Sequence, residues 1–133
     1  MGTVSGIHHA KLPVSDVARS RDWYVRVLGF EVDIEFIEEG VLSGIALRHP
    51  GGPASLALRH DPDRAAAMNG FDALALLVPS HAEVTAWEAR LDAAGEQHGG
   101  VVTGHTGGRI LVGLTDPDGI EIRLYADPED DHS

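Results

Sequence analysis

The start of the chain alternates apolar and polar side chains with a period of two. Residues 7–14 therefore predict a strand with two different faces. Ser15-Asp16 supplies a helix N-cap, and Gly29 is placed where a helix commonly ends in the left-handed conformation. The helix predicted between them carries its buried face at Val17, Ser20, Tyr24, Val27 and Leu28. We expect this face to pack against the apolar face of the strand, formed by Ala10, Leu12 and Val14.

Three β-rich stretches follow, at residues 30–38, 41–49 and 54–60, and then the pattern begins again. A strand is predicted at residues 71–78. A helix begins at the capping box Ser80/Glu83 and ends at Gly95. The predicted buried positions of this helix are Val84, Trp87, Leu91 and Ala94. The last three strands are expected at residues 101–103, 109–114 and 120–125, with a tight turn at Asp116-Pro117-Asp118-Gly119.

The two halves repeat the order strand–helix–three strands with an offset of roughly 65 residues. The sequence thus predicts an α+β domain of two tandem βαβββ modules. Module one covers about residues 6–60, module two about residues 71–126, and residues 127–133 form an acidic tail that we interpret as a solvated chain end. Neither helix can cover a sheet alone, so the modules should share a core or a dimer interface. Exposed strand edges favour a homodimer.

Composition narrows the possible partners. The chain has 133 residues and a formal net charge of −11, which disfavours binding to nucleic acid and to anionic membrane surfaces. No apolar run approaches the ~20 residues of a membrane span. Cysteine is absent, which excludes disulfides, thiolate catalysis and thiolate metal sites, and fits a cytoplasmic location.

Several segments together resemble the glyoxalase, bleomycin-resistance and extradiol-dioxygenase superfamily, also called the vicinal-oxygen-chelate superfamily. They are residues 9–16 (HAKLPVSD), Trp23-Tyr24, residues 27–30 (VLGF), residues 87–95 (WEARLDAAG) and residues 116–124 (DPDGIEIRL). The resemblance covers nearly the whole chain. It implies a fold in which the two modules form cupped mixed sheets around a cavity.

The resemblance also implies four metal-ligand positions, filled by His or Glu in the metal-dependent members. In this chain the four positions are His9, Ala57, Ala73 and Arg123. Alanine has no donor atom, and the protonated guanidinium of arginine cannot coordinate a cation. Asp72 and His60 are expected on the opposite strand face. We therefore predict no bound metal and no cofactor, which disfavours the metal-dependent activities that the resemblance would imply.

Strand alternation predicts which side chains line the cavity. The candidate ligand-binding residues are His9, Lys11, Ala57, Arg59, Ala73, Glu121, Arg123 and Tyr125. Guanidinium groups favour planar oxyanions, so the cations indicate an anionic or aromatic organic ligand. Purely structural roles stay open at this point: His9 satisfied by a backbone carbonyl, Lys11 and Arg59 reaching solvent, and Arg123 paired with Glu121 or another acid.

Three functions fit these residues. The first is metal-independent binding of a small molecule, of the sequestration or resistance type. The second is a metal-free lyase or isomerase, with His9 as the catalytic acid or base and Arg123 stabilising an oxyanion. The third is a glyoxalase- or dioxygenase-like metalloenzyme with relocated ligands. An enzyme needs a titratable pair within reach, which His9 and Glu121 could provide, so the sequence leaves open whether the protein is catalytic.

Overall fold

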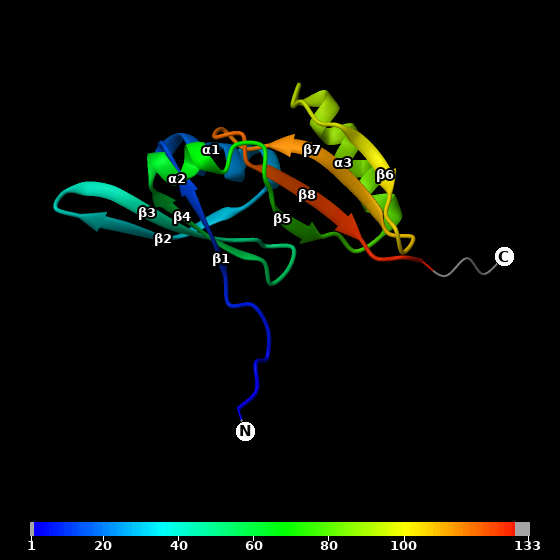
Figure 1. Ribbon diagram of the computed structural model, residues 1–133, viewed down its shortest axis with the longest axis horizontal. Coiled ribbons are helices and arrows are strands. Elements are labelled where there is room, and N and C mark those ends of the chain that lie inside the picture. The colour runs from blue at the N-terminus through cyan, green and yellow to red at the C-terminus, as the bar shows by residue number, and fades with distance from the viewer. Residues whose placement is uncertain (1, 130–133) are drawn as a thin grey trace. The chain divides into compact units, whose positions relative to one another are not determined.

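The computed structural model describes residues 2–129 and divides into two compact units between Ala67 and Met68 (Figure 1). Over this range the chain forms eight strands in two four-stranded mixed sheets, together with three helices. Each unit contains the order strand–helix–three strands, and a further short helix ends the first unit. The predicted α+β fold of two βαβββ modules is therefore confirmed.

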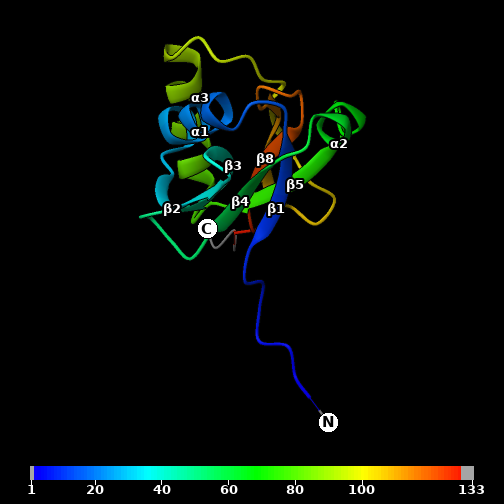
Figure 2. The same ribbon diagram turned by 90° about the vertical axis from the view of Figure 1, so that its left-hand side faces the viewer.

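The first unit builds its sheet in the order β1-β4-β3-β2. Strands β1 (Ala10–Val14) and β4 (Ser55–His60) are parallel and lie side by side in Figure 2, whereas β3 (Val41–Arg48) is antiparallel to both of its neighbours. Strand β2 (Glu31–Glu38) forms the far edge of the sheet and a long hairpin with β3. Helix α1 (Val17–Leu28) contacts β3 and β4.

Helix α1 begins and ends where the sequence predicts. The Asp16 side chain accepts a hydrogen bond from the Arg19 backbone N–H at 3.0 Å, and Gly29 closes the helix with φ at 78°. All five predicted face residues are buried, and Trp23 is buried with them. His49 fixes the helix end, because its Nε2 lies 2.8 Å from the Leu28 carbonyl oxygen.

The second unit repeats the arrangement with strand order β5-β8-β7-β6. Parallel strands β5 (Asp72–Leu77) and β8 (Glu121–Ala126) are followed by antiparallel β7 (Arg109–Thr115) and β6 (Gly100–Thr103). Helix α3 (His81–Ala93) packs on β6, β7 and β8. Ser80 caps it by accepting from the Glu83 N–H at 3.1 Å. Glu83 pairs with Arg90 at 2.8 Å.

The structure departs from the sequence expectations at the start of the first strand, in an additional short helix, and in the burial of two α3 positions. The first strand begins at Ala10 instead of residue 7, and a short helix α2 (Pro62–Ala67) follows module one. Trp87 is only half-buried and stacks with the Arg90 guanidinium at 4.7 Å. Ala94 is exposed because the α3 core contact rests on Val84 and Leu91.

The acidic tail is also more ordered at its start than we predicted. The His81 backbone N–H donates to the Glu129 carboxylate, and the His81 ring nitrogen Nε2 lies 2.9 Å from the Asp127 carbonyl oxygen. The first tail residues therefore bind the N-terminus of α3, where a carboxylate is favoured. The remaining tail residues, 130–133, lie outside the described residues.

Candidate functional site

In each unit the longer helix, α1 or α3, packs against one face of the sheet. In the first unit the helix-covered side chains are buried, and they include Leu12, Val14, Ile45, Leu47, Leu56 and Leu58. Because side chains alternate along a strand, the intervening residues form the opposite face. We call this opposite surface the open face of a unit.

Two rows of side chains cross the open face of the first unit. Strand pairing places Lys11 beside Ala57, Ala57 beside Ala46, and Ala46 beside Ile34. The next row holds Pro13, Arg59, Gly44 and Phe36. Ile34 is 48% exposed and Phe36 46% exposed, so the face offers accessible apolar surface next to cationic side chains. Ile34 and Phe36 were not among the predicted binding residues, although their alternation with Asp33 and Glu35 in β2 is a period-two signal.

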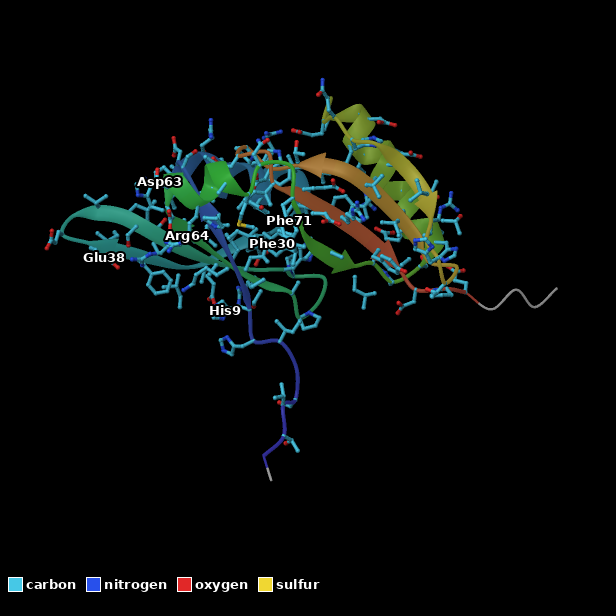
Figure 3. All side chains as sticks on the ribbon, in the orientation of Figure 1. His9, Phe30, Glu38, Asp63, Arg64 and Phe71 are labelled. Carbon is cyan, nitrogen blue, oxygen red and sulfur yellow. The ribbon has the colours of Figure 1, made fainter. Side chains whose placement is uncertain are left out.

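The two cations on this face differ in their partners. Arg59 Nη1 lies 3.3 Å from a carboxylate oxygen of Glu38, the last residue of β2 (labelled in Figure 3). Lys11 is exposed and makes no ion pair or hydrogen bond with the described residues. The charge of Arg59 is therefore partly compensated within the unit, and that of Lys11 is not.

His9 lies on the segment that leads into β1, outside the ladder (Figure 3). It is exposed, and its Nδ1 is 2.8 Å from Nδ1 of His8, with the two rings edge to face. The prediction that His9 is a strand residue is wrong, because pairing with β4 begins at Ala10. His9 is thus set apart from the ladder that fixes Lys11 and Ala57.

A three-residue ionic cluster occupies the open face of the second unit. Arg123 donates from Nε to Glu121 Oε2 at 2.6 Å, and its Nη1 lies 3.3 Å from Asp72 Oδ2. The Gly113 backbone N–H donates to the same glutamate oxygen at 3.2 Å. Asp72 was expected on the opposite strand face. That expectation is wrong, because the β5 ladder is irregular between Asp72 and Leu74, and Asp72 pairs beside Glu121.

This cluster fixes the charge states of its members. The hydrogen bond from Arg123 lowers the pKa of Glu121. Burial opposes this effect, and the Gly113 N–H makes a smaller contribution in the same direction as Arg123. The same hydrogen bond raises the pKa of Arg123 above its ordinary value. Glu121 is therefore held as a carboxylate whose Oε2 is engaged by two donors.

Ala73 and Tyr125 complete the predicted set. Ala73 is half-buried at the irregular start of β5. Its methyl group offers no polar contact to a ligand. The Tyr125 ring lies directly against Gly108, where an added Cβ would come within 2.6 Å of Cε1. The turn between β6 and β7 is closed by a bond from Gly104 N–H to the Gly108 carbonyl at 2.7 Å.

The residues at the four implied metal positions do not fit a metal ion. They offer one imidazole, two methyl groups and a guanidinium already bonded to two carboxylates. In residues 2–129 no group of three or more His, Asp or Glu side chains is placed to hold a metal elsewhere. No mechanistic step can therefore be derived through a metal at this site.

The sequence profile of the Glyoxalase/Bleomycin resistance protein/Dioxygenase superfamily matches residues 6–124. The chain belongs to this superfamily. The match spans both modules, in agreement with the order of elements described above. No curated protein sequence gives a significant match to the chain.

Solved structures share the fold across nearly the full chain. A glyoxylase/bleomycin resistance protein/dioxygenase domain from Frankia sp. EAN1pec is 24% identical with a TM-score of 0.72, covering 98% of this chain and 96% of that one. TnmS3, an antibiotic binding protein from Streptomyces sp. CB03234, is 25% identical with a TM-score of 0.71 and coverages of 97% and 100%. The fosfomycin resistance protein FosX from Listeria monocytogenes is 17% identical, with a TM-score of 0.69 and coverages of 94% and 95%.

The length and hydropathy of the helices show whether any of them could span a membrane. Among the residues that the structure describes, no helix combines the length and the apolar character needed to cross a bilayer.

Proposed function

We propose that this protein binds a small aromatic or anionic organic molecule on its open faces, without a metal ion, and that it acts by sequestration. The proposal rests on the residues that occupy the four metal-ligand positions implied by the resemblance. Ala57 and Ala73 leave space where donor side chains would stand, and Arg123 is committed to Glu121 and Asp72. A planar ligand can use this space, because pockets for organic ligands are mostly apolar with few polar groups.

The accessible surface favours an aromatic ligand over a highly charged one. Phe36 lies across Gly44, where an added Cβ would stand 3.8 Å from its ring. Together with Ile34 and Ala46 it forms a flat apolar strip on the sheet. Of the predicted cations, Arg59 and Arg123 already have carboxylate partners. Lys11 is the cation best placed to meet a ligand carboxylate.

The ionic cluster argues against the acid–base alternative. A general base works best with a pKa near the working pH, whereas the pKa of Glu121 is lowered by Arg123. Two N–H groups of Arg123 already point at carboxylates, which leaves fewer donors for an oxyanion. His9 lies exposed outside the ladder. The placement of Glu121, Arg123 and His9 therefore favours ligand binding over catalysis.

Proteins of similar fold that bind an antibiotic or confer resistance support sequestration. TnmS3 is an antibiotic binding protein, and FosX is a fosfomycin resistance protein. Fold likeness alone does not carry function. The proposal for this chain therefore rests on its own open faces.

We also infer a homodimer, located in the cytoplasm. Each sheet ends in strands that pair on one side only within their sheet, and these strands carry large exposed apolar side chains. Leu77 of β5, for example, is 74% exposed. A second copy would cover such surface. The absence of cysteine fits a reducing compartment.

The test is a titration with naphthoate and with neutral naphthamide, followed by NMR shifts of backbone amides. Both probes should perturb β2, β3 and β4, and Ala57→Trp should abolish the effect by filling the open face. Phe36→Ala, which changes a half-exposed side chain, should weaken binding without unfolding the protein. Ala18→Trp, on the exposed side of α1, is the matched control and should bind as the wild type does. Absence of any perturbation, or equal binding by Ala57→Trp, would contradict the proposal.

A further inference from the structure

Asn69 is the only asparagine in the chain, and Gly70 follows it. Both residues are exposed, in the link between α2 and β5. The Asn69 amide nitrogen Nδ2 donates to the Asp118 carbonyl at 3.1 Å, and the Gly70 backbone N–H donates to the Gly119 carbonyl at 2.8 Å. We call these two hydrogen bonds, which hold the link to the β7–β8 turn, the clasp.

The Asn-Gly dipeptide has an intrinsic chemistry of its own. With no side chain on glycine, its backbone nitrogen can approach the asparagine side chain closely. The Gly70 nitrogen loses its proton and bonds to Asn69 Cγ, the Cγ–Nδ2 bond breaks, and ammonia leaves. Water then opens the cyclic imide at one of its two carbonyls and gives aspartate or isoaspartate. Water is the only co-reactant that this sequence requires.

The clasp engages both groups that this reaction needs. The attacking nitrogen, Gly70 N, is fixed by donation to Gly119, and the leaving group, Nδ2, is fixed by donation to Asp118. Gly70 is held at φ 82°, a conformation that favours glycine. Closing the imide ring requires the Gly70 nitrogen to turn toward Asn69 Cγ, which breaks its bond to Gly119. The reaction must therefore wait for local opening.

We propose that Asn69 is a deamidation site that the clasp keeps closed in the folded protein. Opening of the clasp frees the two reacting groups, and the conversion removes the hydrogen bond from position 69 to the Asp118 carbonyl. A carboxylate at position 69 cannot donate to the Asp118 carbonyl, so two acceptors would face each other. The modified chain has lost one of the two bonds that hold the link.

The deamidation site at Asn69 is close in the chain to the ionic cluster formed by Asp72, Glu121 and Arg123. Phe71, adjacent to Gly70, accepts the Glu121 N–H at 2.9 Å, and Asp72 pairs beside Glu121 at the start of β5. Loosening the clasp therefore frees the end of the ladder that positions Asp72 against Arg123. Deamidation should disturb this open face without altering any residue of the cluster itself.

The test compares deamidation of the full chain when folded and when unfolded in urea, at one pH and temperature. Peptide mapping by mass spectrometry separates the asparagine, aspartate and isoaspartate forms of residue 69. The folded protein should deamidate at least about tenfold more slowly, because only clasp-opened molecules react. Equal rates in the folded and unfolded chain would overturn the proposal.

Gly119→Ala tests the clasp directly. A Cβ at Gly119 would overlap the Asn69 amide nitrogen, so the folded variant should deamidate faster than the wild type. Gly95→Ala is the matched control, since Gly95 has a similar φ of 73° but open space around it, and it should leave the rate unchanged. A Gly119→Ala rate equal to that of Gly95→Ala would contradict the clasp.

Hydrogen exchange of the wild type keeps the proposal testable if Gly119→Ala does not fold. Exchange of the Gly70 amide and deamidation of Asn69 should rise in parallel as urea is added below the unfolding transition. Deamidation that stays constant while the Gly70 amide opens would refute the coupling.

Discussion

Replacing Glu121 with glutamine should weaken the second unit by an amount set by its bonds to Arg123 and Gly113. Glu121 is largely buried, with its side chain 17% exposed, and it accepts from Arg123 at 2.6 Å and from Gly113 at 3.2 Å. Hydrogen bonds to charged groups contribute about 1.5–3 kcal/mol. Arg123 is 37% exposed and keeps Asp72 as a partner, so part of its charge remains compensated. We expect a loss of about 1–2 kcal/mol at neutral pH.

The pH dependence of this loss follows from the pKa of Glu121. Its folded pKa is lowered below the ordinary value of 4.5, so the unfolded chain binds the proton more readily. The carboxylate therefore stabilises the fold fully above that ordinary value. This contribution is lost as the pH falls through the lowered folded pKa, where the wild type and Glu121→Gln should converge in stability.

Urea denaturation followed by circular dichroism, at neutral and at acid pH, measures the difference. Glu88→Gln is the matched control, because Glu88 lies on α3 of the same unit and makes no ion pair with the described residues. The reasoning is refuted if Glu121→Gln is as stable as Glu88→Gln at neutral pH. It is equally refuted if the loss persists unchanged in acid.

Three further predictions test other parts of the structure. The wild type should sediment as a dimer at micromolar concentration, and a lone 14.1 kDa species would contradict the inferred homodimer. His49→Ala should cost about 1–3 kcal/mol in urea denaturation, because the ring contacts the Leu28 carbonyl at 2.8 Å and accepts from the Gly51 N–H at 3.0 Å. His105→Ala, in the exposed β6–β7 turn, should change stability little by comparison. Gly108→Ala should lower the melting temperature by overpacking Tyr125, at a cost of about 1–3 kcal/mol, whereas Gly52→Ala meets open space and should not.

The fold could be predicted from the sequence because local signals agreed with one another. Asp16 and Ser80 cap the two long helices as predicted, and Gly29 ends the first in the left-handed conformation. The Asp116 turn also forms, with its carboxylate accepting from the Asp118 and Ile120 backbone N–H groups. Capping and turn chemistry act over a few residues, so a single sequence contains them.

The candidate site was harder to predict because it depends on strand register. The ladder irregularity before Leu74 brings Asp72 to Arg123, and no local pattern marks an irregularity of this kind. His9 was wrongly included in the first strand, because its alternation with Lys11 continues the β pattern beyond the paired segment, which begins at Ala10. Trp87 fits the apolar spacing of α3, but it lies half-buried against Arg90. The strand pairing that places Asp72 and ends the first ladder at Ala10 joins segments that lie far apart in the sequence.

Metal content of tag-free protein, measured together with melting in the presence and absence of a chelator, tests metal-independent binding most directly. A ligand bound only to the folded state stabilises it, so removing a structural ion would lower the melting temperature. With Ala57, Ala73 and Arg123 at three of the four implied positions, we expect far less than stoichiometric Ni, Zn, Fe, Mn or Co and no chelator shift. A stoichiometric ion that is lost in His9→Ala, with a matching fall in melting temperature, would contradict the proposed function.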